Sequence, residues 1–378
     1  MCAPEQKERS VKNVNVIIAG GGTGGHLFPG IAIAEEFLRR NRGDRILFVG
    51  TNKGIEKRVL ESLGFSLQTI DVEGIKGKGW MKSLAAILRI PISLIQSLRI
   101  VRGFSPELVI GVGGYASGPV VFVARLLGIR AAIAEQNALP GLTNRILGKV
   151  VDRVFVSFAQ TGQWFHARKV MVSGNPIRHG FAAEMKQPKE QNRPFTLLVF
   201  GGSQGAHAVN RAMLEALDDL GPVKEHLRII HQTGGKDLDV VAHAYRAKGV
   251  TADVLPFIMD MAAAYQTADL LVCRAGATSI AEITAAGKAA ILIPFPAAVE
   301  DHQTKNAEVL VQADAAEMIP EKELTGARLA AAIKRYYENP QLLREMEIRS
   351  AGMGNIRAAE DIVDACLALV QRGDNRDG

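Results

Sequence analysis

The segment VNVIIAGGGTGGH, residues 14–26, determines the fold of the first half of the chain. An apolar, β-branched run leads into a glycine-rich turn and then into a helical pattern, which predicts a buried strand, a tight turn and a helix. The segment FTLLVFGGSQGA, residues 195–206, repeats this arrangement. Both turns have the form Gly-Gly-(Thr/Ser)-x-Gly, so the sequence predicts two related units that each begin in the same way.

Strand and helix patterns alternate outward from both segments. Strands are expected at residues 14–19, 45–49, 67–72, 108–112, 131–134 and 153–156 of the first half, and at 195–200, 227–231, 253–257, 270–273 and 289–293 of the second. This alternation predicts an α/β protein with two Rossmann-like, doubly wound parallel-sheet domains that face a cleft. We expect one domain at residues 1–175, a second at 176–354, and a C-terminal helix within 355–378 that crosses back to the first domain.

Composition and charge narrow the class of protein. The 378 residues are 47% hydrophobic and 22% charged, which is typical of globular domains. Residues 1–175 hold 23 Lys and Arg against 12 Asp and Glu, a net charge of +11, whereas residues 176–378 hold 22 against 27, a net charge of −5. The basic half indicates an anionic partner, and charge scattered over a solvated surface is the alternative.

Cysteine spacing and hydropathy indicate a cellular setting. Cys2, Cys273 and Cys366 are far apart and form no metal-binding spacing, which favours a reducing, cytoplasmic compartment. Residues 1–13 do not resemble a signal peptide, and no apolar run reaches the roughly 18–20 residues that a membrane span requires. We therefore expect a protein that is soluble or bound to a membrane at its surface.

The glycine-rich turns predict phosphate binding. A turn between a strand and a helix directs backbone N–H groups and the positive end of the helix dipole at one point, and glycine lets a phosphate approach closely. A third such turn, GGYASGP at residues 113–119, follows the strand at 108–112. A tight turn without a ligand is the alternative for any single one, but two turns at equivalent places favour ligand binding.

Other motifs compete for the same glycines. The spacing within residues 20–25 fits a dinucleotide fingerprint, but no acidic residue follows the second strand to bind a ribose. The sequence around Ser203 fits the nucleophile elbow of a hydrolase, with Asp269 or Asp301 and His302 further along the chain. This hydrolase remains an alternative, as does a nucleotide sensor without catalytic activity.

A denser set of polar residues occurs in the second half. Residues 274–282 run from a strand through small residues into a helix, where hydroxyl groups and helix amides can meet a phosphate. Glu282 lies about one turn into this helix and can accept two hydroxyls of a ribose, although the helix dipole alone also favours a glutamate there. The polar segment 300–306 follows the strand at 289–293 and is typical of a ligand-binding loop.

Together these segments resemble the MurG family of peptidoglycan N-acetylglucosaminyltransferases. The resemblance covers residues 14 to about 368 and rests on GGTGGH (21–26), GGYASGP (113–119), EQN (135–137), GNPIR (174–178), GGSQGA (201–206) and residues 274–282. It implies the GT-B fold and an inverting hexosyltransferase. The implied reaction moves GlcNAc from UDP-GlcNAc to the C4 hydroxyl of undecaprenyl-diphospho-MurNAc-pentapeptide (lipid I), which gives lipid II.

The resemblance also implies a cellular role and partners. The enzyme would serve peptidoglycan synthesis, and through it cell shape and division. Its partners would be UDP-GlcNAc, lipid I, an anionic membrane surface and other cell-wall and division proteins, with no nucleic acid. It would use no cofactor, because UDP-GlcNAc is a substrate, and would lie peripherally on the cytoplasmic face of the bacterial inner membrane.

The resemblance also implies roles for individual residues. The residues implied to bind the donor are Thr23, Gly24, Gly25, Asn137, Arg178, Ser203, Ile258, Ala277, Thr278, Ser279, Ile280, Ala281, Glu282 and Gln303. We expect the acceptor diphosphate to meet Gly113, Gly114, Tyr115, Ser117 and Gly118. Within the donor set, Ile258 is implied to contact uracil through its backbone. Thr304 stands where a family member has a second sugar-binding glutamine.

An inverted product implies a single displacement, which needs a base for the acceptor hydroxyl and a group that stabilises departing UDP. His26 is the candidate base, because an imidazole is largely neutral near pH 7. A histidine that only orders the turn is the alternative, and Glu135 is the reserve candidate.

Asp237-Leu238-Asp239 matches the metal-binding motif of other transferases but opens a surface helix, so we expect no metal. Amides near Ser203 and residues 277–279 would offset the leaving charge.

A membrane-binding segment is expected at residues 76–102. It holds six basic residues and no acidic one, interleaved with more apolar side chains than one core-facing stripe requires. The patch is expected to comprise Lys76, Lys78, Trp80, Met81, Lys82, Leu84, Leu88 and Arg89. Burial of the apolar side chains in the core is the alternative. Those that stay exposed would attach the protein reversibly to anionic lipid.

Overall fold

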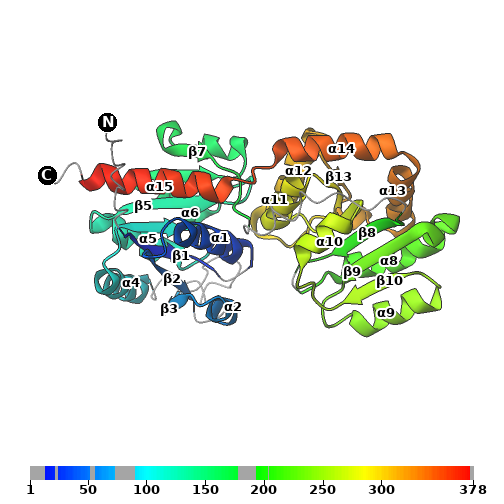
Figure 1. Cartoon of the computed structure of the whole chain (residues 1–378), viewed down its shortest axis with the longest axis horizontal. Helices are drawn as coiled ribbons and strands as arrows, with labels where there is room; N and C mark the ends of the chain where they lie inside the picture. Colours follow the sequence, from blue (N-terminus) through cyan, green and yellow to red (C-terminus); the bar gives the residue numbers. More distant parts are fainter. Residues whose placement is uncertain are drawn as a thin grey trace, which may run out of the picture. The chain divides into compact units, whose positions relative to one another are not determined.

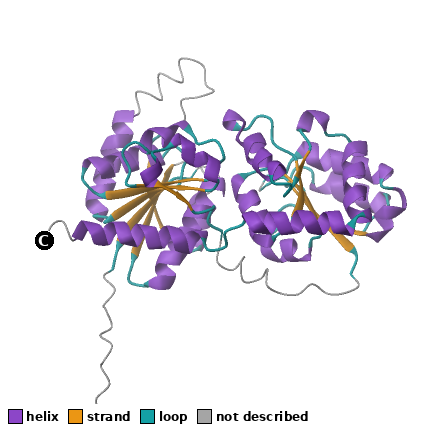
Figure 2. Cartoon of the chain, turned by 90° about the horizontal axis from the view of Figure 1, so that it is seen from above, coloured by secondary structure: helices purple, strands orange, loops and turns teal. Residues whose placement is uncertain are grey.

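The structure is a computed structural model that describes residues 13–21, 24–51, 56–72, 90–177, 193–202 and 204–374. The chain forms two compact units (Figure 1). Unit 1 comprises Met1–Ala134, Ile146–Arg153 and Ile362–Gly378, and unit 2 comprises Glu135–Arg145 and Val154–Asp361. Two parallel sheets form the frame, and helices cover both faces of each sheet (Figure 2).

The first sheet contains seven strands in the order β3-β2-β1-β4-β5-β6-β7. The strands are β1 (Asn15–Ala19), β2 (Arg45–Thr51), β3 (Ser66–Ile70), β4 (Leu108–Gly111), β5 (Arg130–Glu135), β6 (Arg153–Val156) and β7 (Val170–Val172). The central strand β1 pairs in parallel with both β2 and β4. Its residues 16–19 are fully buried, because helices cover both of its faces, and this explains the uninterrupted apolar run of the sequence.

The helices that accompany the first sheet are α1 (Gly24–Arg40), α2 (Glu56–Ser62), α4 (Ile90–Phe104), α5 (Ser117–Leu126), α6 (Leu142–Leu147) and the C-terminal α15 (Ala358–Asp374). In the last turn of α1, Arg39 and Arg40 both donate hydrogen bonds to the buried Glu36, and their charges suit the negative end of the helix dipole. Arg40 also pairs with Asp364 of α15. This ion pair joins the last helix to the first and supports the expected return of the chain.

The second sheet contains six strands in the order β10-β9-β8-β11-β12-β13, and all neighbouring strands are parallel. The strands are β8 (Phe195–Phe200), β9 (Leu227–Gln232), β10 (Ala252–Leu255), β11 (Leu270–Cys273), β12 (Ala289–Leu292) and β13 (Glu317–Met318). The accompanying helices are α8 (His207–Asp219), α9 (Leu238–Ala247), α10 (Met261–Thr267), α11 (Ala277–Ala286), α12 (His302–Gln312), α13 (Gly326–Glu338) and α14 (Pro340–Met353).

Alternate residues of β8 build two separate layers of the core of unit 2. Leu197 and Val199 belong to a cluster that includes apolar residues of α8 and α13, whereas Leu198 and Phe200 belong to one with residues of α10, α11 and α12. Successive side chains of a strand point to opposite faces of the sheet, so a strand covered on both sides must be apolar throughout. This arrangement holds the carboxyl end of β8, and the turn that follows it, in a fixed place.

The prediction of two Rossmann-like parallel-sheet domains is confirmed. Every strand expected from the sequence is present, with ends that differ by at most two residues. The sequence did not predict β7 and β13, because three and two residues are too short for a periodic pattern. Within the described residues, no helix has both the length and the apolar character needed to cross a membrane.

Candidate functional site

Each sheet has one point at which its strand order reverses. In the first sheet this point lies between β1 and β4, and in the second between β8 and β11. The chain leaves such neighbouring strands in opposite directions, so their carboxyl ends leave a crevice in which α/β sheets bind ligands. The glycine-rich turns follow β1, β4 and β8, and residues 274–282 follow β11. All four predicted segments therefore lie at the reversal point of their own sheet.

His26 lies against the turn that follows β4. It is half-buried in the first turn of α1, directly after the half-buried Gly24 and Gly25. A Cβ atom at residue 113 would be 2.5 Å from the Nδ1 atom of His26, so the imidazole has room only because Gly113 has no side chain. Gly113 also has a φ of +93°, which favours glycine. The predicted base therefore sits between the two turns of the first reversal point.

The predicted acceptor loop joins β4 to α5. Gly114 packs on the backbone of Gly21, since a Cβ atom at residue 114 would be 2.3 Å from that carbonyl oxygen. Tyr115 is exposed and Gly118 is half-buried, so a ligand can reach both. Ser117 is fully buried, and its hydroxyl has no hydrogen-bond partner in the described part of the chain. The expected contact between Ser117 and a diphosphate stays a prediction.

Glu135, the reserve candidate for the base, holds a loop together. Its buried carboxylate accepts hydrogen bonds from the backbone N–H groups of Asn137 (3.0 Å) and Gly141 (3.1 Å). The side-chain amides of Asn137 (3.2 Å) and Asn144 (2.9 Å) donate to it as well. Both carboxylate oxygens therefore accept hydrogen bonds from this loop. This arrangement favours a structural role for Glu135 and leaves His26 as the candidate base.

The first turn of α11 is the candidate site for an anion. Gly276 precedes the helix and makes no side-chain cap, and Ala277, Thr278 and Ser279 form the first turn. The first N–H groups of a helix have no partner within the helix and carry the positive end of its dipole. The hydroxyl oxygen of Thr278 is buried and has no partner among the described residues. A phosphate group would satisfy both the N–H groups and the hydroxyl.

Further along α11, the side chains separate into anchors and candidate ligand contacts. Ile280 is buried in the core of unit 2, so it fixes the helix and does not reach a ligand with its side chain. Ala281 and Glu282 are half-buried and can be reached. Burial, and after it the charge of Glu282, raises the pKa of the Tyr265 hydroxyl on α10 well above its usual value. The same two causes raise the pKa of the Cys273 thiol.

The first turn of α12 holds the predicted sugar contact Gln303. The side-chain oxygen of Gln303 accepts a hydrogen bond from the N–H of Phe295 (2.9 Å), which leaves its amide N–H groups to donate to a sugar hydroxyl. Thr304 donates to the carboxylate of Asp301 (2.6 Å), so its hydroxyl serves the start of the helix. Glu300 and Asp301 have φ values of +53° and +56°. Such strain costs about 1–3 kcal/mol per residue and is concentrated at ligand-binding loops.

Ile258 can meet a base only through its backbone. Its side chain is buried in the same core layer as Phe200. Its N–H donates a hydrogen bond to the side-chain oxygen of Gln232 (2.8 Å), so the backbone contact predicted for uracil is limited to the Ile258 carbonyl. A carbonyl can accept a hydrogen bond from the imide N–H of uracil.

Asn306 is a site residue that the sequence did not single out. It is fully buried, and its side-chain oxygen accepts a hydrogen bond from the N–H of Ala138 (2.8 Å). Its amide donates to the side-chain oxygen of Asn137 (3.2 Å) and to the carbonyl of Ala275 (3.3 Å). Asn306 therefore orients a predicted donor residue, Asn137, beside the loop that leads into α11. The only signal in the sequence was its place at the end of the polar segment 300–306.

Several predicted residues lie outside the described part of the chain. These are Thr23, Arg178 and Ser203 of the donor set and the whole membrane patch from Lys76 to Arg89.

The structure places one residue from each of two competing motifs. Asp269 lies before β11, where its carboxylate accepts a hydrogen bond from the N–H of Thr196 (2.9 Å) and pairs with Arg193. The turn with Ser203 follows the other end of β8, so Asp269 cannot orient a histidine beside that serine. In the metal-binding motif, the carboxylate of Asp237 accepts a hydrogen bond from Asn210 (2.8 Å). No group of three His, Cys, Asp or Glu side chains in the described ranges is placed to hold a metal ion.

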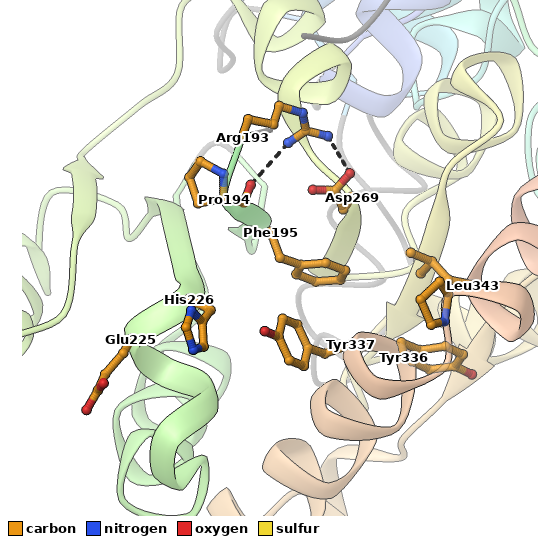
Figure 3. A pocket seen from close by; sticks show the side chains of 10 residues that line it. Arg193, Pro194, Phe195, Glu225, His226, Asp269, Tyr336, Tyr337 and Leu343 are labelled. Atoms are coloured by element: carbon orange, nitrogen blue, oxygen red, sulfur yellow. Dashed lines mark hydrogen bonds and ion pairs between the residues drawn. The ribbon is translucent and has the colours of Figure 1, made fainter. Parts of the chain in front are cut away.

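A surface pocket of about 680 Å³ lies at the amino ends of the central strands of the second sheet (Figure 3). Phe195, at the start of β8, lines it together with His226, Tyr337 and the ion pair of Arg193 and Asp269. The reversal point lies at the carboxyl end of β8, one strand length away, so this pocket is separate from the predicted donor site.

Comparisons with known proteins agree with this geometry. The model of the glycosyltransferase family 28 N-terminal domain matches residues 16–156, and that of the C-terminal domain matches residues 196–364. The chain is 62% identical over 358 residues to a Syntrophus aciditrophicus protein, with 95% of this chain and 99% of the relative covered. That relative is named UDP-N-acetylglucosamine–N-acetylmuramyl-(pentapeptide) pyrophosphoryl-undecaprenol N-acetylglucosamine transferase.

Solved structures show the same fold. The crystal structure of Acinetobacter baumannii MurG matches with a TM-score of 0.78 and 34% identity, over 94% of this chain and 99% of that one. A UDP-GlcNAc 2-epimerase from Neisseria meningitidis matches with a TM-score of 0.64 but only 12% identity, over 94% of this chain and 99% of that one. A likeness at that identity concerns the fold alone, so the fold does not by itself distinguish a transferase from an epimerase.

Proposed function

The chain belongs to glycosyltransferase family 28, and from this premise we propose that it transfers GlcNAc from UDP-GlcNAc to the C4 hydroxyl of undecaprenyl-diphospho-MurNAc-pentapeptide. The 62% identical relative is named for the same donor and acceptor. The product is lipid II, an intermediate of peptidoglycan synthesis, and the enzyme is a hexosyltransferase with the GT-B fold.

The observation that carries the donor side of this proposal is the first turn of α11. Its uncapped N–H groups and the partnerless hydroxyl of Thr278 suit the diphosphate of a nucleotide sugar. Glu282 follows on the same helix, where a carboxylate can accept hydrogen bonds from both hydroxyls of a ribose. Phosphate and ribose are neighbours in UDP-GlcNAc, so one helix would bind both.

The proposed chemistry is a single displacement at the anomeric carbon of GlcNAc. The acceptor oxygen forms a bond to this carbon as the bond to the UDP oxygen breaks, which inverts the α-linkage of the donor to a β-linkage. His26 takes the proton of the acceptor hydroxyl, as a general base must. The negative charge that develops on UDP is stabilised by the amides of α11, which are oriented before the reaction begins.

We propose that the acceptor is bound by unit 1, which also holds the predicted GlcNAc contacts Thr23, Gly24 and Gly25, and that the nucleotide of the donor is bound by unit 2. Unit 1 contains His26 and the loop from Gly113 to Gly118. Unit 2 contains α11, Gln303 and Asn137, which bear the predicted contacts to the diphosphate, the ribose and the sugar.

Helix α4 supports binding to a membrane surface, because two of its isoleucines are exposed while two of its serines are buried. Ile92 and Ile95 are 50% and 52% exposed, whereas Ser93 and Ser97 are fully buried. The serine hydroxyls are satisfied inside the helix, since they donate to the carbonyls of Ile90 (2.8 Å) and Ser93 (2.7 Å). A helix that served only the core of unit 1 would bury the isoleucines.

Cations follow these isoleucines along the helix. Ile92, Ile95, Arg99 and Arg102 are spaced by three or four residues, so they share one face, and all four are exposed. Leu126 of the adjacent α5 adds a side chain that is 70% exposed. Apolar side chains with neighbouring cations suit the interface of an anionic leaflet. We infer reversible attachment at the cytoplasmic face of the inner membrane, where contacts with cell-wall and division proteins remain a prediction.

The fate of UDP-GlcNAc with and without acceptor tests the proposed reaction. The enzyme should release UDP only when a soluble lipid I analogue is present, because the acceptor hydroxyl is the nucleophile. Conversion of UDP-GlcNAc to its 2-epimer without acceptor would instead support the epimerase activity known for this fold. Release of free GlcNAc would support a hydrolase.

A further inference from the structure

Gln232 lies between the two segments that are expected to hold the nucleotide. It is the last residue of β9, which stands between β8 and β10. Its partners in the sheet are Phe200 and Leu255, the last residues of those strands. The glycine turn therefore leaves the sheet on one side of Gln232, and the segment with Ile258 leaves it on the other.

The side chain of Gln232 joins these segments. Its amide donates a hydrogen bond to the carbonyl of Gly202 (2.7 Å), and its side-chain oxygen accepts one from the N–H of Ile258 (2.8 Å). The residue is only 1% exposed, so water does not compete for these groups. An amide suits the position because it carries a donor and an acceptor on one carbon.

The first bond prepares the glycine turn for an anion. The carbonyl of Gly202 also accepts a hydrogen bond from the N–H of Gly205 (2.9 Å), so two donors occupy both of its lone pairs. A carbonyl oxygen that faced the ligand would repel a phosphate. Gln232 keeps this oxygen hydrogen-bonded within the protein, so that it does not face the ligand.

The second bond determines what the base-binding segment can recognise. With its N–H held by Gln232, Ile258 can offer a base only its carbonyl, which is an acceptor. Uracil presents a donor at N3, whereas cytosine presents an acceptor there. The carbonyl therefore matches N3 of uracil and opposes N3 of cytosine.

We propose that Gln232 is a positioning residue that orients the glycine turn towards the donor diphosphate and sets the preference of the site for uracil. The inference rests on the proposed function, because it assigns UDP-GlcNAc to these segments. Gln232 acts through Gly202 and Ile258 and does not itself touch the donor.

Calorimetric titration of the full chain with UDP and CDP tests the choice of base. Gln232→Met keeps the size of the side chain but removes both hydrogen bonds. It should weaken UDP binding by about tenfold or more and lower the ratio of UDP to CDP affinity, because the freed N–H of Ile258 can now serve cytosine. A merely structural loss would weaken both nucleotides equally, and that result would overturn the inference.

Gln232→Glu adds a test by pH with UDP-GlcNAc as the ligand. At about pH 8 an ionised carboxylate would repel the Gly202 carbonyl and weaken binding. At about pH 6 a protonated carboxyl again has one donor and one acceptor, so binding relative to wild type should recover to within about threefold. Gln312→Glu, on the exposed end of α12, is the matched control and should follow wild type at both pH values.

The possible outcomes distinguish a failure of the proposed function from a failure of the role proposed for Gln232. If wild type binds neither UDP nor UDP-GlcNAc, the proposed function fails, and the role of Gln232 fails with it. If wild type binds both while Gln232→Met and Gln232→Glu also bind like wild type at both pH values, only the role of Gln232 is overturned. Thermal melting of each variant is compared with that of wild type to confirm that the titrated protein is folded. If Gln232→Glu does not fold, the titrations of Gln232→Met decide the outcome.

Discussion

Glu282 and His26 have different tasks in the proposed reaction, so their loss should have different kinetic consequences. Glu282 is proposed to bind the ribose, a part of the donor that does not react, so we expect its contact to be equally strong before and during the reaction. His26 accepts a proton only as the new bond forms. Loss of the first kind of contact raises KM, and loss of the second kind lowers kcat.

We predict that Glu282→Ala raises the KM for UDP-GlcNAc by about 30- to 1000-fold, because hydrogen bonds to a charged group in a desolvated site contribute roughly 2–4 kcal/mol. Steady-state kinetics with varied donor measure this effect. Glu345→Ala on the surface of α14 is the control and should leave KM unchanged. A near-normal KM for Glu282→Ala would exclude the ribose contact.

We predict that His26→Ala lowers kcat by about 10²–10⁴-fold while calorimetry finds the affinity for UDP-GlcNAc retained, because the predicted uridine contacts belong to unit 2. His243→Ala, at an exposed position of α9, is the control. A fall in kcat of less than about tenfold would assign His26 to ordering the turn with Gly113.

Single residues also show where sequence reasoning stops. Ser117 and Thr278 both lie in the first turn of a helix, and each has a buried hydroxyl without a hydrogen-bond partner among the described residues, yet Ser117 is fully buried whereas Thr278 is half-buried. Only the packing of neighbouring strands decides between these outcomes. The roles of Gln232 and Asn306 depend on partners distant in the sequence, which no local pattern encodes.

At the scale of elements, the strands could be predicted because parallel strands covered on both faces must be continuously apolar. The glycine turns were placed correctly for a similar reason, since each ends a recognisable strand. Helix α4 was harder, because an exposed isoleucine and a core isoleucine look alike in the sequence. The burial of Ser93 and Ser97 shows which face turns inward.

We predict that replacing both Ile92 and Ile95 with Asn weakens binding to vesicles that contain anionic lipid by about tenfold or more, because each isoleucine contributes roughly 1–2 kcal/mol when it leaves water. Co-sedimentation with vesicles at several salt concentrations measures this effect. Ile348→Asn on α14, which is 59% exposed, is the matched control. Unchanged binding of the double variant, or equal binding of wild type to neutral and anionic vesicles, would contradict the membrane role of α4.

At the scale of the whole molecule, the two halves of the sequence differ both in net charge and in the predicted contacts that they hold. The half of the sequence with a net charge of +11 contains α4 and the predicted acceptor loop, and the half with a net charge of −5 contains the predicted nucleotide contacts. A lipid-linked acceptor arrives from an anionic surface, whereas UDP-GlcNAc arrives from solution. The division therefore suits an enzyme that joins a membrane-bound substrate to a soluble one.

The product itself tests the central claim most directly. The enzyme is incubated with a lipid I analogue and UDP-GlcNAc labelled with ¹³C at the anomeric carbon, and the product is characterised by mass spectrometry and NMR. We predict one GlcNAc per acceptor, joined to the C4 oxygen of MurNAc by a β-linkage, with one UDP released for each bond formed. Label recovered as free GlcNAc, as the 2-epimer of the donor, or in an α-linkage would contradict an inverting transfer to lipid I.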